Sequence, residues 1–223
     1  MTRTLGIAVI GQAPRDDIAA LFAAQAPAGT TVILRGCLDG MSDDEVAAIA
    51  PRDGADTLYT RLPGDRDVKI SKKAVVERAP ATLARLRDEG ADALVFNCTG
   101  AFPAMPGDAG VLFPSRVLAG LSAGLLPSGR LGLLVPLAEQ AAKLTEKWQR
   151  PGVEVVVEAL APSASDAEAE AAASRLKAKA PDLIAMDCMS YTPATKDIVK
   201  RVADVPTLLG VTATARVLRE LLE

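Results

Sequence analysis

Histidine is absent from the 223 residues, and its absence excludes several kinds of functional site. Without an imidazole the chain has no Ser-His-Asp triad, no Cys-His dyad and no histidine-ligated metal. Any proton transfer near neutral pH must use cysteine, aspartate, glutamate, lysine or tyrosine. We also expect that the site holds no metal ion and no cofactor.

Aromatic residues are scarce, at 3% of the chain, and the 25 Lys and Arg residues do not outnumber the 28 Asp and Glu residues. Proteins that bind nucleic acids need a basic stripe and aromatic stacking platforms, so we expect no nucleic-acid partner. The interior must be built from small aliphatic side chains, which is typical of an α/β protein.

Hydrophobic runs of membrane-spanning length are also missing. The N-terminal run Leu5–Ile10 is short and is followed by Gly11 and Gln12, so it predicts a first strand rather than a signal peptide. The three cysteines, Cys37, Cys98 and Cys188, show no CxxC spacing. The simplest interpretation is that all three are free thiols in a reducing cytoplasm. We expect no membrane partner.

Continuous apolar runs alternate with helical patterns, which indicates parallel sheets covered by helices on both faces. The predicted strands are Leu5–Ile10, Thr31–Leu34, Ala93–Phe96, Leu131–Val135, Glu154–Val157, Leu183–Met186 and Thr207–Leu209. The predicted helices are Arg15–Ala26, Ser71–Glu89, Ser115–Gly124, Leu137–Gln149, Ser165–Ala180, Pro193–Ala203 and Thr212–Leu222. Thr192 is the predicted N-cap of the helix that Pro193 begins, and Ser115 that of another.

The stretch 39–66 is the least regular part of the chain. It combines a short acidic helix, Ser42–Ile49, with turn residues such as Gly54 and Gly64. We interpret it as a surface excursion; the alternative is a cap over a cleft.

The two halves of the chain resemble each other. The run Leu5–Val9 matches Leu131–Val135 at an offset of 126, and the strand that ends before Cys98 matches the one that ends before Cys188 at an offset of 90. The sequence therefore predicts two pseudo-symmetric α/β lobes, each with a parallel sheet and with the active site in the cleft between them. We expect residues 1–117 with 205–223 to form the first lobe and 118–204 the second.

Cys98 and Cys188 are the predicted catalytic residues. Ligands of open α/β sheets bind beyond the carboxyl ends of the strands, where both thiols lie. One thiolate can remove a proton from a carbon while the other thiol donates a proton to the opposite face, which inverts the carbon without a cofactor. The helix that begins at Pro193 favours a nearby thiolate through its dipole. We expect Cys37 to act as a packing residue only.

Further residues near the predicted strand ends can hold a small substrate that carries a carboxylate. The predicted substrate-binding residues are Gln12, Arg15, Asn97, Thr99, Gly100, Ser115, Arg116, Pro136, Ser190, Tyr191 and Thr192. The Arg15 guanidinium offers a two-pronged contact to a carboxylate. Asp16 and Asp17 are better explained by the helix dipole, and Asp187 is a candidate to relay a proton if its pKa is raised.

The sequence resembles the AroM family over nearly its whole length. The stretches that carry the resemblance are IGQAPRDDI (10–18), LDGMSDDEV (38–46), KISKKAVVE (69–77), FPSRVL (113–118), GLLVPLAEQ (132–140), EKWQ (146–149) and LIAMDCMSYT (183–192). This family is similar to the aspartate/glutamate/hydantoin racemase superfamily, which includes maleate isomerase and arylmalonate decarboxylase. The resemblance implies two α/β lobes with one thiol from each, and a C-terminal helix, Thr212–Leu222, that packs on the first lobe.

Three functions stay open at this point. The first is a cofactor-independent racemase or isomerase that uses both thiols on a small carboxylate-bearing substrate. The second is an isomerase or decarboxylase of the same superfamily that uses one cysteine. The third is a non-catalytic protein that binds a metabolite linked to aromatic amino-acid metabolism. We expect a homodimer, because most soluble oligomers are of that kind.

Overall fold

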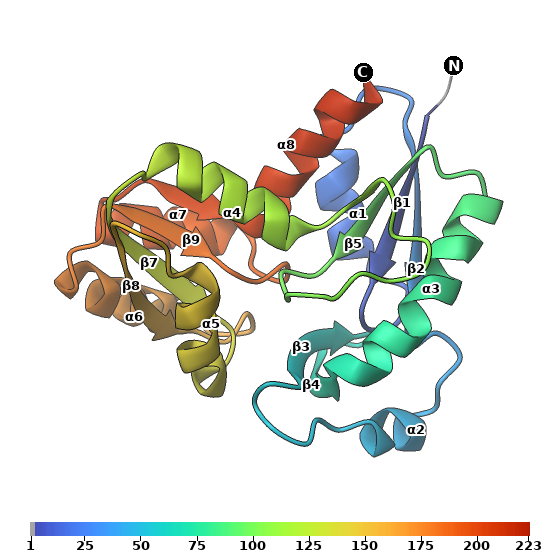
Figure 1. Ribbon diagram of the computed structural model, residues 1–223, viewed down its shortest axis with the longest axis horizontal. Helices are drawn as coiled ribbons and strands as arrows, with labels where there is room; N and C mark the ends of the chain where they lie inside the picture. Colours follow the sequence, from blue (N-terminus) through green and yellow to red (C-terminus); the bar gives the residue numbers. More distant parts are fainter. Residues whose placement is uncertain (1–2) are drawn as a thin grey trace. The chain divides into compact units, whose positions relative to one another are not determined.

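The computed structural model describes residues 3–223, and contacts within the chain divide it into two compact units. Unit 1 consists of the chain up to Pro114 together with Thr214–Glu223, and unit 2 of Ser115–Ala213. Each unit is an α/β lobe with a parallel four-stranded sheet, which confirms the fold class predicted from the sequence (Figure 1). In the described part of the chain, no helix has the length and apolar character needed to cross a bilayer.

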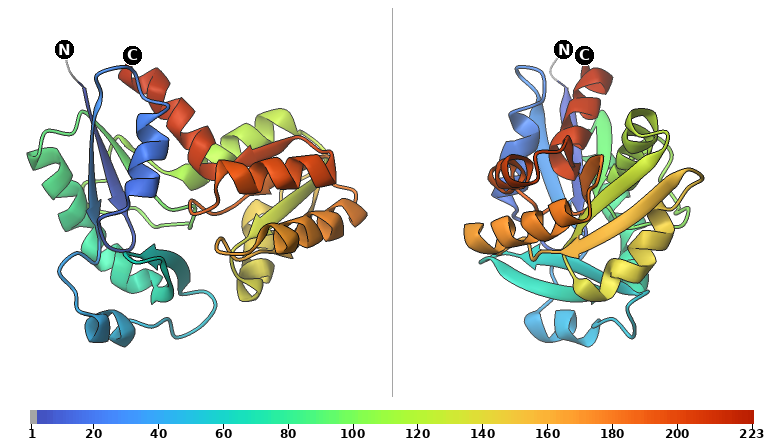
Figure 2. Two further views of the ribbon diagram at one scale, coloured as in Figure 1. Left: turned by 180° about the vertical axis from the view of Figure 1, so that it is seen from behind. Right: turned by 90° about the vertical axis from the view of Figure 1, so that its left-hand side faces the viewer.

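The sheet of unit 1 has the strand order β2-β1-β5-β6. Its strands are β1 (Thr4–Val9), β2 (Thr31–Gly36), β5 (Ala93–Asn97) and β6 (Val111–Leu112), and its helices are α1 (Asp16–Ala23), α2 (Asp43–Ala48) and α3 (Lys72–Asp88). Helix α3 covers one face of this sheet, and α1 lies on the other with the C-terminal part of α8 (Figure 2).

The sheet of unit 2 has the equivalent order, β10-β9-β7-β8. Its strands are β7 (Gly129–Val135), β8 (Val153–Ala159), β9 (Leu183–Met186) and β10 (Thr207–Leu209). The helices from α4 onward are α4 (Pro114–Leu125), the 3₁₀ turn η1 (Ala138–Gln140), α5 (Ala141–Trp148), α6 (Asp166–Ala178), α7 (Pro193–Ala203) and α8 (Gly210–Leu222). Helices α6 and α7 pack side by side.

Helix α8 leaves unit 2 and joins unit 1 from Thr214 onward. Arg216 contacts the side chain of Gln25, with 3.5 Å between Nε and Oε1. This confirms that the C-terminal helix packs on the first lobe, as the family resemblance implied.

The ends of two helices follow the capping signals of the sequence, and the start of a third does not. The Thr192 side chain accepts a hydrogen bond from the backbone N–H of Thr195, and Pro193 is the first residue of α7. Gly90 follows α3 with φ +89°, which suits a residue without a Cβ. Ser115 is not an N-cap, because α4 already begins at Pro114 and places it in the first turn.

The stretch 39–66 is more regular than predicted. Strand β3 (Thr57–Leu62) forms an antiparallel hairpin with β4 (Arg66–Ser71). Leu58 and Leu62 are buried on one face of β3, whereas Tyr59 on the other face is only half-buried. This alternation, followed by Pro63 and Gly64, is a hairpin signal that the sequence interpretation missed.

The segment Leu137–Gln149 is not one continuous helix, which corrects another expectation. A 3₁₀ turn at Ala138–Gln140 precedes α5, which begins at Ala141. Pro136 ends the preceding strand region. Without a polar capping side chain at Leu137, the chain reaches α geometry only after this tighter turn.

A close approach at one glycine is common to both sheets. A Cβ built on Gly6 of β1 would lie 2.6 Å from Leu94 and 2.8 Å from Ala91, and one on Gly132 of β7 would lie 3.2 Å from Ile184 and 3.1 Å from Pro181. The contacting residues of the two units are related by the same offset of 90 as the two cysteines. Only glycine lets the neighbouring side chains pack this close to the opening strand.

An aspartate at the amino end of each sheet repeats the same contact. The backbone N–H of Thr4 donates to Asp92 Oδ2 at 2.7 Å, and that of Arg130 donates to Asp182 Oδ2, also at 2.7 Å. Each aspartate returns a bond from its own N–H to the carbonyl of the same partner. Because these pairs obey both sequence offsets, they show that the echo between the halves is a repeated structure.

Each unit has its own core of aliphatic side chains. In unit 1 the hairpin residues Leu58, Leu62 and Ile70 pack in the same buried cluster as Cys37. Burial raises the pKa of the Cys37 thiol from 9.0 to about 12. Cys37 is therefore a protonated packing residue in the native state, in agreement with the sequence analysis.

We expect Gly6→Ala to destabilise the protein by about 1–3 kcal/mol, because the new methyl group overlaps Leu94 and Ala91. Gly132→Ala should cost less, since its neighbours lie farther away. Gly120→Ala is a suitable control: it lies in α4 with open space around it and should stabilise the helix by about 0.5–1 kcal/mol. Urea unfolding measures all three, and a Gly6→Ala protein as stable as the wild type would contradict the packing argument.

The raised pKa of Cys37 predicts a loss of stability at alkaline pH. The native state keeps a proton that the unfolded state releases near pH 9.0, so the contribution is complete below 9.0 and is lost between 9.0 and about 12. In that window the wild type should lose about 1.4 kcal/mol per pH unit more than Cys37→Ala. Urea unfolding of both proteins from neutral to alkaline pH checks this, and parallel stability curves would refute it.

Candidate functional site

The strand register places Cys98 and Cys188 at equivalent positions of the two sheets. Leu5 of β1 pairs with Ala93 of β5, and Leu131 of β7 pairs with Leu183 of β9. Each cysteine comes five residues after the partner of the opening strand, just beyond the carboxyl end of its sheet. Each thiol thus lies at the carboxyl end of its sheet, which is where α/β proteins bind ligands.

Cys98 is half-buried in the turn that follows β5. Its sulfur accepts a hydrogen bond from the backbone N–H of Gly100, at 3.3 Å. A hydrogen bond donated to the sulfur favours the thiolate form. A Cβ on Gly100 would lie only 3.1 Å from Phe102, so this position favours glycine. Thr99, between them, is buried. Gly100 therefore contributes through its backbone.

Asn97 directly precedes Cys98 and is 7% exposed. Its Oδ1 is a buried oxygen with no hydrogen-bond partner among the described residues. A buried acceptor without a donor is costly, so natural structures seldom leave one unexplained. A ligand with an N–H or O–H group is one explanation of this atom.

Cys188 is buried and is the second residue of the loop between β9 and α7. Tyr191, fully buried, anchors this loop by donating from its hydroxyl to the carbonyl of Leu160 at 2.6 Å. The Thr192 hydroxyl caps α7, and Ser190, directly before Tyr191, is half-buried. Two of the three predicted binding residues of this loop thus hold its conformation.

Asp187, directly before Cys188, lies in a buried polar cluster that the sequence analysis did not anticipate. Its carboxylate accepts from Lys147 Nζ at 3.0 and 3.3 Å and from Trp148 Nε1 at 2.7 Å. Asp187 and Lys147 form an ion pair, with side chains 1% and 17% exposed. The stretches EKWQ and MDC each contain one half of this cluster, but their separation in the sequence gave no sign of the pairing.

The loop after β1 is braced by residues that the sequence predicted to bind substrate. Gln12 donates from Nε2 to the carbonyls of Leu38 and Met41, at 3.1 and 2.7 Å. Arg15 is buried at the N-cap position of α1, so it lies before the first turn in which it was predicted.

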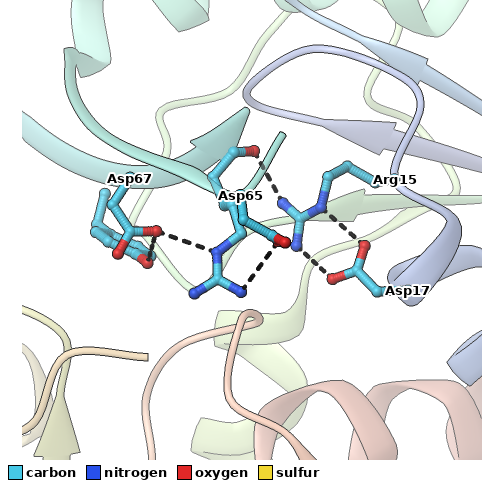
Figure 3. Close-up of polar contacts among 6 residues, drawn as sticks. Arg15, Asp17, Asp65 and Asp67 are labelled. Carbon is cyan, nitrogen blue, oxygen red and sulfur yellow. Dashed lines mark hydrogen bonds and ion pairs between the residues drawn. The ribbon is translucent and has the colours of Figure 1, made fainter. Parts of the chain in front are cut away.

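Arg15 makes two kinds of contact (Figure 3). It binds the Asp17 carboxylate through Nε and a terminal nitrogen, at 2.9 and 2.7 Å, and donates to the backbone carbonyl of Arg61 in the hairpin at 3.0 Å. Burial alone would raise the pKa of Asp17, but the pKa is lowered by the hydrogen bonds and charge of Arg15, with smaller contributions from the Ile18 backbone and Arg61. Arg61 in turn contacts Asp67 and Asp65. A pocket of about 320 Å³ adjoins this cluster, lined by Pro14, Arg15, Asp16, Asp17, Leu62, Pro63, Gly64 and Asp65.

The remaining predicted residues lie in unit 2. Ser115 is half-buried and Arg116 exposed, both in the first turn of α4, and Pro136 is buried just after β7. Unit 1 therefore contains Cys98, Gln12, Arg15, Asn97, Thr99 and Gly100, and unit 2 contains the other predicted residues. Within residues 3–223, no cluster of three or more thiol and carboxylate side chains is arranged to hold a metal ion.

Comparison with solved structures shows which proteins share this fold. An unliganded arylmalonate decarboxylase matches with a TM-score of 0.65 and 16% identity, over 100% of this chain and 93% of its own. Maleate isomerase from Pseudomonas putida matches with a TM-score of 0.63 and 11% identity, over 99% and 92%. Glutamate racemase from Francisella tularensis, in complex with D-glutamate, matches with a TM-score of 0.58 and 17% identity, over 99% and 81%.

At these identities the likeness establishes the aspartate/glutamate racemase-like fold. No curated protein matches the sequence. The sequence profile of one family, described as AroM protein, matches residues 5–222. The chain therefore belongs to the AroM family.

Proposed function

We propose that this AroM-family protein is a cofactor-independent racemase or isomerase in which Cys98 and Cys188 transfer protons at the Cα of a small carboxylate-bearing substrate. The observation that carries the proposal is the shared register, which puts one thiol at the same position of each repeated sheet. The fold, common to racemases, an isomerase and decarboxylases, supports an enzyme of this kind.

The proton balance of the reaction needs no other reactant. One thiolate takes the Cα proton, and the electron pair of the broken C–H bond stays on the substrate as an enolate. The other cysteine, as thiol, donates its proton to the opposite face of the carbon and becomes the thiolate. Nothing is oxidised or reduced, and the next turnover runs in the reverse sense. This requires the two strand ends to face one substrate molecule, which is part of the proposal.

The unpartnered Oδ1 of Asn97 narrows the substrate class. At neutral pH a carboxylate offers only acceptors, so it leaves this oxygen without a donor. An ammonium, amide or hydroxyl group next to the reacting carbon would supply one. We therefore favour amino acids and cyclic amides over malonates or maleate, and we assign Asn97 to binding that donor.

A second candidate, an isomerase or decarboxylase that relies on one cysteine, is favoured by a difference between the two thiols. Asn97 is neutral and Asp187 carries a charge, although both occupy the position before the cysteine. Unequal surroundings suit unequal roles. Loss of CO₂, or inversion that survives the loss of one thiol, would identify this chemistry.

Deuterium incorporation tests the two-thiol reaction. The wild type is incubated in D₂O with pooled amino acids, hydantoins and 2-substituted dicarboxylic acids, and NMR follows the Cα proton. We expect exchange in one pool and a loss of at least about 100-fold in Cys98→Ser and in Cys188→Ser, because each removes a proton-transfer group. Cys37→Ser, which alters only a core thiol, is the matched control.

An unchanged rate in Cys98→Ser would sink the two-thiol assignment. Absence of exchange in every pool, together with a ligand-dependent rise in thermal stability, would identify the third candidate, a binding protein.

Substitution by leucine should affect the free energy of unfolding differently at the equivalent positions Asn97 and Asp187. Asn97→Leu removes an unsatisfied buried acceptor, so the unliganded protein should be as stable as the wild type or about 1 kcal/mol more stable, while ligand binding is lost. Asp187→Leu leaves Lys147 and Trp148 without their acceptor and should cost about 3–5 kcal/mol. Urea unfolding compares the two, and a strongly destabilised Asn97→Leu protein would show that Asn97 has a structural role instead.

A further inference from the structure

Three side chains of unit 2 form a cluster that includes Asp187, the residue directly before Cys188 in the chain. Helix α5 contributes Lys147 and Trp148 from adjacent positions, and Asp187 accepts from both. Lys147 Nζ also lies over the Trp148 ring, 5.1 Å from its centroid, and Trp148 itself is 3% exposed. The carboxylate is thus fixed in orientation by the indole N–H and held beside a cation.

The repeat within the chain provides an internal reference for this cluster. Asn97 is the counterpart of Asp187 in unit 1, and it precedes its cysteine without a charge. The fold therefore does not require a carboxylate before the thiol. A buried ion pair is expensive to desolvate, so its presence at this one position points to a role beyond packing.

We propose that the Lys147–Asp187 pair sets the charge that Cys188 experiences, and so controls how readily its thiol ionises. With both partners present, the ammonium compensates the carboxylate next to the cysteine in the chain. Loss of Lys147 leaves a net negative charge there, which opposes a thiolate. Neutralising Asp187 leaves a net positive charge, which favours one. Lys147 and Asp187 are positioning residues in this scheme, because they act through Cys188.

Strand β8, next to β7 in the same sheet, contributes two carboxylates. The carboxylates of β8 pair with basic residues: Glu154 with Arg130, and Glu158 with Arg175 and Lys179. The inference rests on the proposed function in one respect. If Cys188 transfers protons, the compensated pair keeps both its thiol and its thiolate accessible. The charge effect itself is testable without any substrate.

The alkylation rate of Cys188 tests the inference. In a Cys37→Ala, Cys98→Ala background, Cys188 is the sole thiol, and mass spectrometry follows its reaction with iodoacetamide at neutral pH. Asp187→Asn should accelerate the reaction and Lys147→Met should slow it, each by about three- to tenfold, because nucleophilic attack needs the thiolate. Lys147→Arg keeps the cation, so its alkylation rate should stay within about twofold of that of the background protein.

The opposite signs separate a charge effect from a structural one. A cluster that only holds the loop in place would make both variants faster, because either change exposes the thiol. Lys143→Met is the matched control, since it removes the same charge from an exposed position of α5. Emission from Trp148, the only tryptophan in the chain, reports whether each variant keeps the cluster's packing.

The inference would be overturned if both variants were accelerated equally. It would also be overturned if the alkylation rate were the same in every protein of the series, which includes the case of a Cys188 thiol that never reacts. These outcomes are independent of the exchange experiment. A protein that exchanges no Cα proton can still show the opposite shifts, and an active racemase can lack them.

Discussion

Backbone pairing between the opening strand of each sheet and the strand that leads to the cysteine is the constraint on which the candidate site depends. In both units the pairing has the same register, and a glycine of the opening strand, Gly6 or Gly132, lets the neighbouring side chains approach it closely. A shift of one residue would turn every side chain to the other face of the sheet. The strand register therefore determines the position of each thiol beyond the carboxyl end of its sheet.

A repeated scaffold does not impose repeated chemistry. The residue before each thiol is an amide in unit 1 and a carboxylate in unit 2, and the structure treats them differently: Asn97 keeps an unpaired oxygen, whereas Asp187 is enclosed by an ammonium and an indole. In a low-dielectric interior both arrangements cost free energy. This cost is retained at two equivalent positions, each directly before a cysteine.

The excursion between β2 and α3 belongs to the architecture of the first lobe. Its hairpin buries Leu58 and Leu62 in the lobe's core, and Arg15 ties the hairpin to the loop after β1 through the carbonyl of Arg61. Gln12 makes a similar link to the chain just after β2. Residues that look like substrate ligands from their position after a strand thus already stabilise the loop on which they lie.

Local patterns in the sequence determined much of this protein. The apolar runs predicted the parallel strands except the two-residue β6 (Val111–Leu112), which was missed. Thr192 with Pro193 predicted the start of α7, and the echo between the halves located the equivalent cysteines. Each of these signals lies within one element or one repeat. Only the tertiary structure decided the partners of Asp187 and Arg15 and the missing partner of Asn97. Lys147 lies 40 residues from Asp187, and Arg15 lies 46 from Arg61. Contacts over such separations arise from the packing of α5 on its sheet and of the hairpin on the first loop, which no periodicity in the sequence records.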